Sequence, residues 1–238
     1  MSFACDFLKG SSSLGILASE RQAALFERYM QVLLEWNKRM NLTAITNEAD
    51  IISKHFLDSL SLLTAVDIQD GAKCIDVGTG AGFPGIPLAI MRDGVSFVLM
   101  DSLQKRVAFL NEVIAELKLK NVTAVWARAE EAGQSPEHRQ KYDFCFSRAV
   151  ARMRILAELC LPMVMCGGKW VCSKGADVRE ELDEARKTVT LLGGKINEAV
   201  PAFIPPDITH SIILVDKKAA TPKAFPRSFS AISKKALE

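Results

Sequence analysis

The segment 74–85, Cys-Ile-Asp-Val-Gly-Thr-Gly-Ala-Gly-Phe-Pro-Gly, constrains the fold of this chain more than any other part of it. A short apolar run ends at Asp76, and glycines follow at positions 78, 80, 82 and 85. Glycine allows the backbone to take positive φ and lets a ligand approach the main chain closely. A helix that starts after such a turn offers N–H groups without intrahelical partners. The segment therefore predicts a strand, a tight turn and a helix start that together hold a cofactor.

Two registers of these glycines indicate different cofactors. G-x-G-x-x-G at residues 80–85 matches the dinucleotide fingerprint, and Asp101 follows about twenty residues later, where a ribose-binding acid belongs. D-x-G-x-G-x-G at residues 76–82 resembles the first-strand motif of Rossmann-like enzymes that use S-adenosylmethionine. We favour the second register, because the first leaves too many residues between the strand and the phosphate turn. Phe83 and Pro84 also add bulk where a pyrophosphate needs an open helix N-terminus.

Side chains around the turn suit S-adenosylmethionine. Backbone groups of residues 78–82, Gly80 among them, would line its methionine part, and Asp76 can accept from its ammonium group. Asp101 can accept two ribose hydroxyls, and Ala129 and Glu130 follow the third strand, where they would bracket the adenine edge. The alternatives are a turn-capping role for the first acid, a helix N-cap for the second and a solvated helix start for Glu130.

Two helices are expected before this segment. From Ser19 onward, apolar residues recur at three- and four-residue steps, and Gln22 completes a capping box. A second helix is expected at about 47–63. We interpret residues 19–65 as an N-terminal helical cap and residues 1–18 as a flexible lead-in.

The pattern changes after the cap. Short apolar strands alternate with amphipathic helices over residues 66–218, which predicts an α/β fold with a doubly wound, mostly parallel sheet of seven strands. The last two strands, expected at 195–203 and 211–215, follow each other without a helix. One edge of the sheet is therefore predicted to be antiparallel. Residues 219–238 form a basic tail that, like the cap, is expected to pack on this domain.

Composition narrows the class of protein. The formal net charge of +2 neither requires nor excludes a nucleic-acid partner, because a local patch matters more than the sum. The six cysteines form no C-x-x-C pair, so we expect them to pack in a core, without metal or disulfides, in a reducing compartment. No apolar run approaches the roughly 20 residues of a membrane helix, and the first ten residues lack a signal-peptide pattern. A cytoplasmic location without membrane contact is expected.

Four blocks of sequence carry a family resemblance: Asn41-Leu-Thr-Ala-Ile45, His55-Phe-Leu-Asp-Ser-Leu60, residues 76–90 and Ser147-Arg-Ala-Val-Ala151. In this order they resemble the RsmG family, also called GidB or glucose-inhibited division protein B, over roughly residues 20–227. The resemblance implies a Rossmann-like class I methyltransferase of the bacterial cytoplasm. It implies transfer of a methyl group from S-adenosylmethionine to N7 of a guanine in 16S ribosomal RNA. The implied partner is that RNA or the small ribosomal subunit, and we expect a monomer.

The resemblance also assigns cofactor residues. Carried over by motif, they are Gly78 and Phe83 in the glycine block, Ala129 and Glu130 after the third strand, and Arg148 after the fourth. The implied reaction needs no general base, because N7 of guanine has a lone pair and no proton. Catalysis then comes from holding N7 in line with the methyl group, and we assign no catalytic residue.

Two further features concern the acceptor side. Arg148 follows the fourth strand at the edge where ligands bind such sheets, so it is our candidate guanine contact, with an ion pair to a neighbouring carboxylate as the alternative. His55 and Asp58, three residues apart on the second helix, are expected to hydrogen-bond the cap to the core.

RNA phosphates require cationic partners. The candidate RNA-binding residues are Arg152, Lys174, Lys223, Arg227, Lys234 and Lys235. A solvated charged face is the alternative for the tail. Here the sequence also departs from the family, which usually continues a Tyr-Pro-Arg segment with a basic run rich in glycine and proline. In this chain Phe225-Pro-Arg227 continues as Ser-Phe-Ser-Ala-Ile-Ser.

The residues alone leave two other functions open. One is a methyltransferase that acts on a small molecule or a protein, and the other is a ribosome-assembly factor without catalytic activity. A nicotinamide oxidoreductase, which the first glycine register would support, is a more distant alternative.

Overall fold

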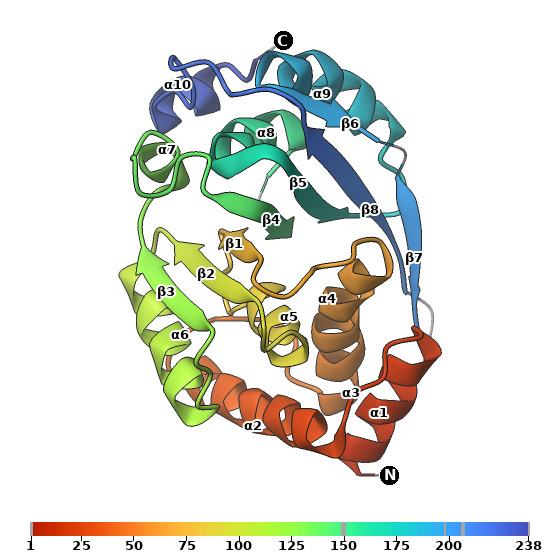
Figure 1. The fold of residues 1–238 in the computed structure, drawn as a ribbon. Helices are drawn as coiled ribbons and strands as arrows, with labels where there is room; N and C mark the ends of the chain where they lie inside the picture. Colours follow the sequence, from red (N-terminus) through yellow and green to blue (C-terminus); the bar gives the residue numbers. More distant parts are fainter. Residues whose placement is uncertain (1, 149–150, 198, 206–207, 238) are drawn as a thin grey trace.

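One sheet forms the centre of the molecule and separates two layers of helices (Figure 1). The computed structural model describes residues 2–148, 151–197, 199–205 and 208–237. Within them the sheet has eight strands in the order β3-β2-β1-β4-β5-β8-β6, and β7 also pairs with β8. The strands are β1 (Lys73–Val77), β2 (Ser96–Asp101), β3 (Val122–Trp126), β4 (Tyr142–Arg148), β5 (Val164–Lys174), β6 (Gly194–Ile196), β7 (Val200–Ile204) and β8 (Ile208–Lys217).

The chain builds the sheet outward from β1 in two directions. β1 pairs in parallel with β2 on one side and with β4 on the other. β3 and β5 extend these two halves, also in parallel. Four of the five residues of β1 are buried, as expected for a central strand covered on both faces. The predicted doubly wound, mostly parallel sheet is confirmed, and the strand order reverses between β1 and β4.

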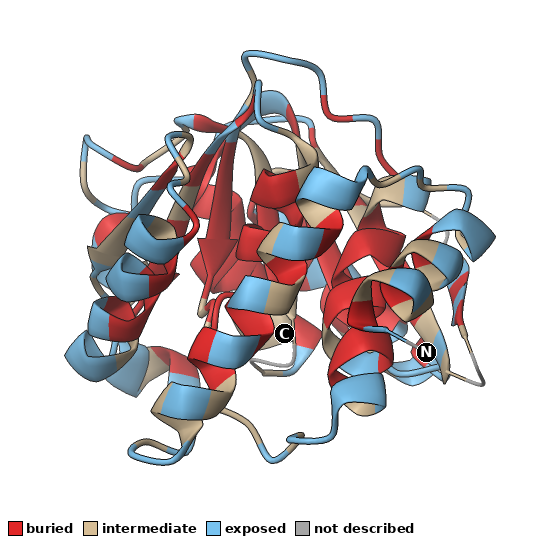
Figure 2. Ribbon diagram, turned by 90° about the horizontal axis from the view of Figure 1, so that it is seen from below, coloured by how far each residue is buried: buried red, intermediate tan, exposed pale blue. Residues whose placement is uncertain are grey.

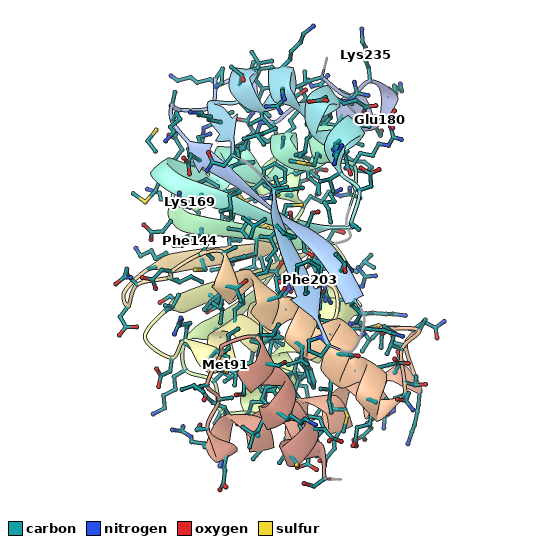
Figure 3. All side chains as sticks on the ribbon, turned by 90° about the vertical axis from the view of Figure 1, so that its right-hand side faces the viewer. Met91, Phe144, Lys169, Glu180, Phe203 and Lys235 are labelled. Carbon is teal, nitrogen blue, oxygen red and sulfur yellow. The ribbon has the colours of Figure 1, made fainter. Side chains whose placement is uncertain are left out.

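The antiparallel edge is also confirmed, but it contains one more strand than expected. β8 runs antiparallel to β5, and both β6 and β7 run antiparallel to β8. The single strand predicted at 195–203 is thus divided, because the ten residues of β8 pair with β6 near one end and with β7 near the other. Figure 3 faces this edge and labels Phe203 on β7, a residue that is 69% exposed.

Helices from the two halves of the chain cover opposite faces of the sheet. The first face carries α1 (Phe3–Ser13), α2 (Glu20–Asn37), α3 (Glu48–Ile51), α4 (Asp58–Ser61), α5 (Gly85–Met91) and α6 (Gln104–Glu116). The second carries α7 (Ala129–Ala132), α8 (Met153–Cys160), α9 (Arg179–Leu191) and α10 (Phe229–Lys234). Figure 2 shows the buried inner sides of these helices against the buried sheet. None of the described helices is both long and apolar enough to cross a bilayer.

The expectation of a flexible lead-in is wrong for most of residues 1–18. Residues 3–13 form α1, which Ser2 caps by accepting from the N–H of Cys5. Phe3 and Phe7, one helical turn apart, are buried, and the ring of Phe7 lies 4.3 Å from that of Phe26 in α2. An i, i+4 pair of aromatic residues on one helix face gives α1 an apolar side that packs on the cap.

The two helices predicted for the cap are present. Ser19 and Gln22 form the predicted capping box at the start of α2. The second helix is continuous but irregular, because a π-helical turn, η1 (Ile52–Leu57), separates α3 from α4, and a 3-10 turn, η2 (Leu62–Thr64), ends it. π-helical turns recur at functional sites, and this one carries His55.

The C-terminal tail packs on the second face of the sheet. Arg139 donates to the carbonyls of Gly133, Phe225 and Thr221, all within 2.8 Å, and so ties the tail to the loop after α7. Lys217 at the end of β8 is buried, and its ammonium group donates to the carbonyls of Leu161, in the 3-10 turn η3 (Leu161–Met163), and Leu192. Burial lowers the pKa of Lys217 to about 8. The division into cap, methyltransferase domain and tail stays a prediction.

Candidate functional site

The glycine segment forms the predicted turn between β1 and α5. Gly78, Gly80 and Gly82 all have positive φ, at 70°, 61° and 94°. A Cβ at position 80 would have only the carbonyl of Gly78 nearby, at 4.0 Å, so the turn is open on that side. At Gly82, by contrast, a Cβ would lie 2.7 Å from the hydroxyl of Tyr29. The turn thus packs on the cap with one side and leaves the other accessible.

Asp76 lies fully buried at the end of β1. Its Oδ2 accepts from the hydroxyl of Thr79 (2.6 Å) and from the N–H of Gly85 (2.8 Å), which is the turn-capping role. Its Oδ1 has no hydrogen-bond partner among the described residues. Burial raises the pKa of Asp76 to about 6, although these two hydrogen bonds oppose the shift. One buried acceptor of the site is therefore left for a donor that the described chain does not supply.

Asp101 ends β2 beside the same turn. Its Oδ2 accepts from the N–H of Gly80 (3.0 Å) and from Arg106 Nη1 (3.2 Å). Its Oδ1 accepts from the N–H of Leu103, the residue that precedes α6. The acid thus orders the glycine turn and the entry to α6 together, and the helix-capping alternative is part of its role.

A cavity of about 410 Å³ opens between the glycine turn, the cap and the end of β2. This volume lies in the range of roughly 300–1,000 Å³ typical of small-molecule sites. Its lining includes five residues named from the sequence: Gly78, Gly80, Phe83, Asp101 and Arg148. Leu42, Thr43, His55, Thr79, Ala81, Ser102 and Arg106 complete it. Residues from the cap, the turn after β1 and the ends of β2 and β4 thus meet at the carboxyl edge of the sheet, beside the switch point.

Phe83 links the turn to the cap. Its ring stacks on that of His55 at 4.5 Å between centroids and 17° between planes, and the guanidinium of Arg148 lies 5.0 Å from the ring centre. Burial, with a further contribution from the Arg148 charge, lowers the pKa of His55 to about 4, so the imidazole is neutral at pH 7. Its Nδ1 faces Arg148 Nη2 (3.4 Å) and must accept, so its Nε2–H donates to the hydroxyl of Thr43 (2.8 Å).

Arg148 and Asp58 form an ion pair that joins the sheet to the cap. Arg148 Nη1 donates to Asp58 Oδ2 (2.5 Å) and to the carbonyl of Lys54 (3.3 Å). Asp58 Oδ1 lies 2.5 Å from Nδ1 of His210, which comes from β8. The predicted cap-to-core hydrogen bond is therefore present for Asp58, and the ion-pair alternative for Arg148 is realised, while Arg148 still lines the cavity.

The charges of this trio shift two pKa values in opposite directions. Burial opposes the ionisation of Asp58, but the His210 hydrogen bond and the Arg148 charge outweigh it and lower the pKa of the carboxyl. The hydrogen bond to Asp58 raises the pKa of His210 despite its partial burial. The carboxylate and the imidazolium thus stabilise each other.

Three predicted cofactor residues, Asp76, Ala129 and Glu130, are absent from the residues that line the cavity. Ala129 and Glu130 begin α7, and Glu130 lies 3.5 Å from Arg128. Trp126 ends β3, is 60% exposed and donates from Nε1 to the carbonyl of Ser102 (3.0 Å). Ser102 lines the cavity, whereas Trp126 is not among the lining residues.

The candidate RNA-binding residues separate into two groups. Arg227 makes a two-pronged ion pair with the buried Glu158 (2.8 and 2.7 Å), and Lys174 lies 2.7 Å from Glu181. Arg152 is mostly exposed and lies 3.5 Å from Glu184. Lys223, Lys234 and Lys235 are exposed on the tail.

Other residues at the two ends of this site were given no role from the sequence. Thr43 lies in the first of the four resemblance blocks, whereas Arg106 and His210 come to the site only through contacts made in the folded chain. A lone histidine in a strand gives no sequence signal. Four cysteines are buried as expected, whereas Cys5 and Cys166 are exposed. Within the described residues, no group of three or more side chains is arranged to hold a metal.

Comparison with solved structures identifies the fold. A SAM-dependent O-methyltransferase from Thermotoga maritima superposes with a TM-score of 0.52 and 15% identity, covering 80% of this chain and 73% of that one. Precorrin-6y C5,15-methyltransferase from Geobacter metallireducens gives a TM-score of 0.51 and 16% identity, with 67% and 86% covered. At these identities the likeness concerns the fold alone, and it is that of Rossmann-like methyltransferases.

Comparison of sequences finds relatives of much higher identity. A ribosomal RNA small subunit methyltransferase G from Alkaliphilus oremlandii is 46% identical over 235 residues, which cover 98% of each chain. A protein of the same name from Lachnoclostridium phytofermentans is 48% identical over 223 residues, covering 93% of this chain and 92% of the relative. The family model GidB, described as rRNA small subunit methyltransferase G, matches residues 22–207. The chain therefore belongs to the rRNA small subunit methyltransferase G family.

Proposed function

We propose that this protein transfers a methyl group from S-adenosylmethionine to N7 of a guanine in 16S ribosomal RNA. The observation that carries the proposal is the 410 Å³ cavity at the glycine turn, found in a chain that belongs to this family. The names of the relatives support ribosomal RNA of the small subunit as the substrate. The choice of N7 rests on the family resemblance of the sequence motifs. We also propose a cytoplasmic monomer that acts on the RNA or the small subunit.

The residues present fit the proposed cofactor. S-adenosylmethionine has a cationic ammonium group, and Oδ1 of Asp76 is a buried acceptor without a partner among the described residues. It has vicinal ribose hydroxyls, and Asp101 presents a carboxylate on the cavity wall. The open side of the turn at Gly80 has room for a ligand against the backbone. We propose that Asp76, Gly78, Gly80, Phe83, Asp101 and Arg148 hold the cofactor, with Ala129 and Glu130 near its adenine.

The side chains would contribute by orientation and by charge. When bound, S-adenosylmethionine supplies an electrophilic methyl group on a positively charged sulfur. The stacked Phe83 and His55 rings would form a flat wall against the cofactor. His55 is neutral at pH 7, so it adds no charge that would repel the sulfonium. Arg148 is held by Asp58 and presents a charged donor group on the cavity wall.

For the RNA we propose a surface made by Arg152, Lys223, Lys234 and Lys235, which are exposed. Cations on such a surface would neutralise phosphates of the RNA backbone. Arg227 and Lys174 are engaged with buried or half-buried carboxylates, and we assign them to holding the fold.

Two measurements test the proposal. Calorimetry should show that S-adenosylmethionine binds the purified protein, and absence of binding at millimolar concentration would contradict an enzymatic role. Small subunits from cells that lack the protein should gain 7-methylguanosine in 16S ribosomal RNA, measured by mass spectrometry, when protein and cofactor are added. Methylation of a free metabolite or of a protein, without methylation of the RNA, would support the alternative methyltransferase function.

A further inference from the structure

A second cavity, of about 330 Å³, adjoins the cofactor cavity. It lies between η1 of the cap, the ends of β4 and β5 and the start of β8. His55 and Arg148 line both cavities. The two cavities are therefore neighbours that share two side chains. Transfer of a group between two ligands requires neighbouring sites, because the reacting atoms must come within roughly 3–3.5 Å of each other.

Two polar groups at the second cavity lack partners. Ser173, at the end of β5, is only 5% exposed, and its hydroxyl makes no hydrogen bond with any part of the chain that the structure describes. The same holds for Nε–H of Arg148, whose other contacts are all made by Nη1 and Nη2. Neither atom is among the fully buried polar atoms without a partner, so both are accessible to solvent. An accessible hydroxyl and a charged donor that the described chain does not use can both bond to a polar ligand.

Asp58 limits how Arg148 can contact that ligand. Nη1 is occupied by Asp58 and by the carbonyl of Lys54, and Nη2 faces His55. An unrestrained arginine reads guanine through O6 and N7 together, which would block the N7 lone pair. With Nη1 held by the carboxylate, a single contact from Arg148 to O6 leaves N7 free. Asp58 and His210 are thus positioning residues for Arg148.

We propose that the second cavity receives the guanine base that is methylated, with Arg148 donating to O6 and the Ser173 hydroxyl bonded to another polar edge of the base. This assignment rests on the function proposed above. The N7 lone pair forms the new N–C bond as the S–C bond of the cofactor breaks. The positive charge passes from sulfur to the base, the neutral thioether leaves, and no proton is transferred. A base inside a cavity of this kind must come from a single strand or be turned out of its stack.

Gly175 offers a direct test, because it lines this cavity and a Cβ added there meets no atom within 4 Å. Gly175→Phe adds an aromatic ring on the cavity wall, starting from a Cβ that meets no neighbouring atom, and Gly175→Ala, with one methyl group, is the matched control. We expect kcat/KM for small subunits to fall at least ~100-fold in Gly175→Phe and much less in Gly175→Ala. The dissociation constant of S-adenosylmethionine and the melting temperature should stay at the wild-type values.

A binding measurement tests the cavity assignment independently of methyl transfer. With the protein saturated with S-adenosylhomocysteine, saturation-transfer NMR should detect guanosine 5′-monophosphate on the wild type and not on Gly175→Phe. Ser173→Ala should lower kcat/KM roughly 2- to 10-fold, as expected for one lost hydrogen bond. Ser211→Ala is its control, since this hydroxyl bonds to the carbonyl of Ala176 (3.1 Å) outside the cavity.

The outcomes distinguish the two proposals. Gly175→Phe that methylates and binds the nucleotide like the wild type would overturn the cavity assignment while leaving the proposed function intact. A wild-type protein that neither binds S-adenosylmethionine nor methylates ribosomal RNA would overturn the proposed function and this assignment with it.

Discussion

Asp58 with Arg148 and Glu158 with Arg227 are both pairs of a buried carboxylate and an arginine, but their surroundings differ. Asp58 is shared with His210, and its arginine lines two cavities and keeps a donor without a protein partner in the described chain. Glu158 is fully buried and accepts from the backbone N–H, Nε and Nη2 of Arg227. Arg227 Nη2 also donates to the carbonyl of Lys235.

This difference predicts a different role for each pair. The second pair is saturated from inside the chain and fastens the tail to α8, so its removal should cost stability. The first pair holds an arginine in one orientation at the meeting point of two cavities, so its removal should cost activity. An arginine in a motif does not reveal which of these roles it has.

Arg227→Ala should have the largest effect on stability. It leaves the carboxylate of Glu158 buried without its cation, which typically costs roughly 3–5 kcal/mol. Urea unfolding followed by circular dichroism measures this loss. Arg39→Ala, which removes an exposed helix-surface pair with Glu35, is the control and should cost about 0.5 kcal/mol or less. A loss below about 1 kcal/mol at Arg227 would show that other contacts hold the tail.

Arg148→Lys should separate activity from stability. Lysine can still pair with Asp58 but lacks the planar set of donors, and loss of one fixed donor typically costs about 10²-fold or more in rate. Methyl incorporation into small subunits should therefore fall at least ~100-fold, with a much smaller change in unfolding free energy than for Arg227→Ala. The control is Arg39→Lys, which should leave the rate unchanged. Similar rates for Arg148→Lys and the wild type would refute the positioning argument.

His210→Gln should remove a pH-dependent part of the stability that the first pair provides. The pKa of His210 is raised by Asp58, so its stabilisation is complete below the unfolded pKa of about 6.5 and is lost as pH rises through the folded pKa. The pKa of Asp58 is lowered, so its contribution disappears only in acid, below about pH 4. The difference in unfolding free energy between wild type and His210→Gln should thus be largest between about pH 4 and 6.5 and shrink above this range.

Arg227→Ala, measured over the same pH range, serves as the comparison for His210→Gln. His55, whose pKa is lowered to about 4 by burial, destabilises the fold as pH falls below 6.5, but it does so in both proteins and cancels in the difference. Arg227 keeps its charge, because its pKa is raised further by Glu158. The effect of Arg227→Ala should therefore stay constant from about pH 6 to 8. A pH-independent effect of His210→Gln would contradict the assigned ion pair.

Lys223→Ser should have the smallest effect of these substitutions, and it should change only the binding of RNA. Loss of one phosphate contact lowers the slope of log affinity against log salt by about 1, while the affinity for S-adenosylmethionine stays the same. Lys9→Ser on α1 is the matched control, since this lysine is exposed on the N-terminal helix. An unchanged slope would remove Lys223 from the proposed RNA surface. A truncation after Pro222 would be a poorer test of RNA binding, because it would also remove Arg227 and its ion pair with Glu158.

The sequence by itself determined the local features of this protein. Positive φ at Gly78, the capping box at Ser19 and the alternation of strands and helices depend on neighbouring residues, so patterns of a few positions predict them. The doubly wound sheet follows from that alternation, because a parallel pair needs a crossover helix. The family, too, was recognisable from four short blocks. The ligand roles of the individual site residues stay predictions.

Only the tertiary structure decided which side chains act together. Asp58 meets Arg148 across 90 positions of the chain and His210 across 152, and neither separation leaves a periodic signal. The burial of Lys217, the packing of α1 and the engagement of Arg227 were equally hidden, because each depends on surfaces contributed by distant segments. Local propensity fixes backbone shape, whereas the partner of a charged side chain is fixed by packing.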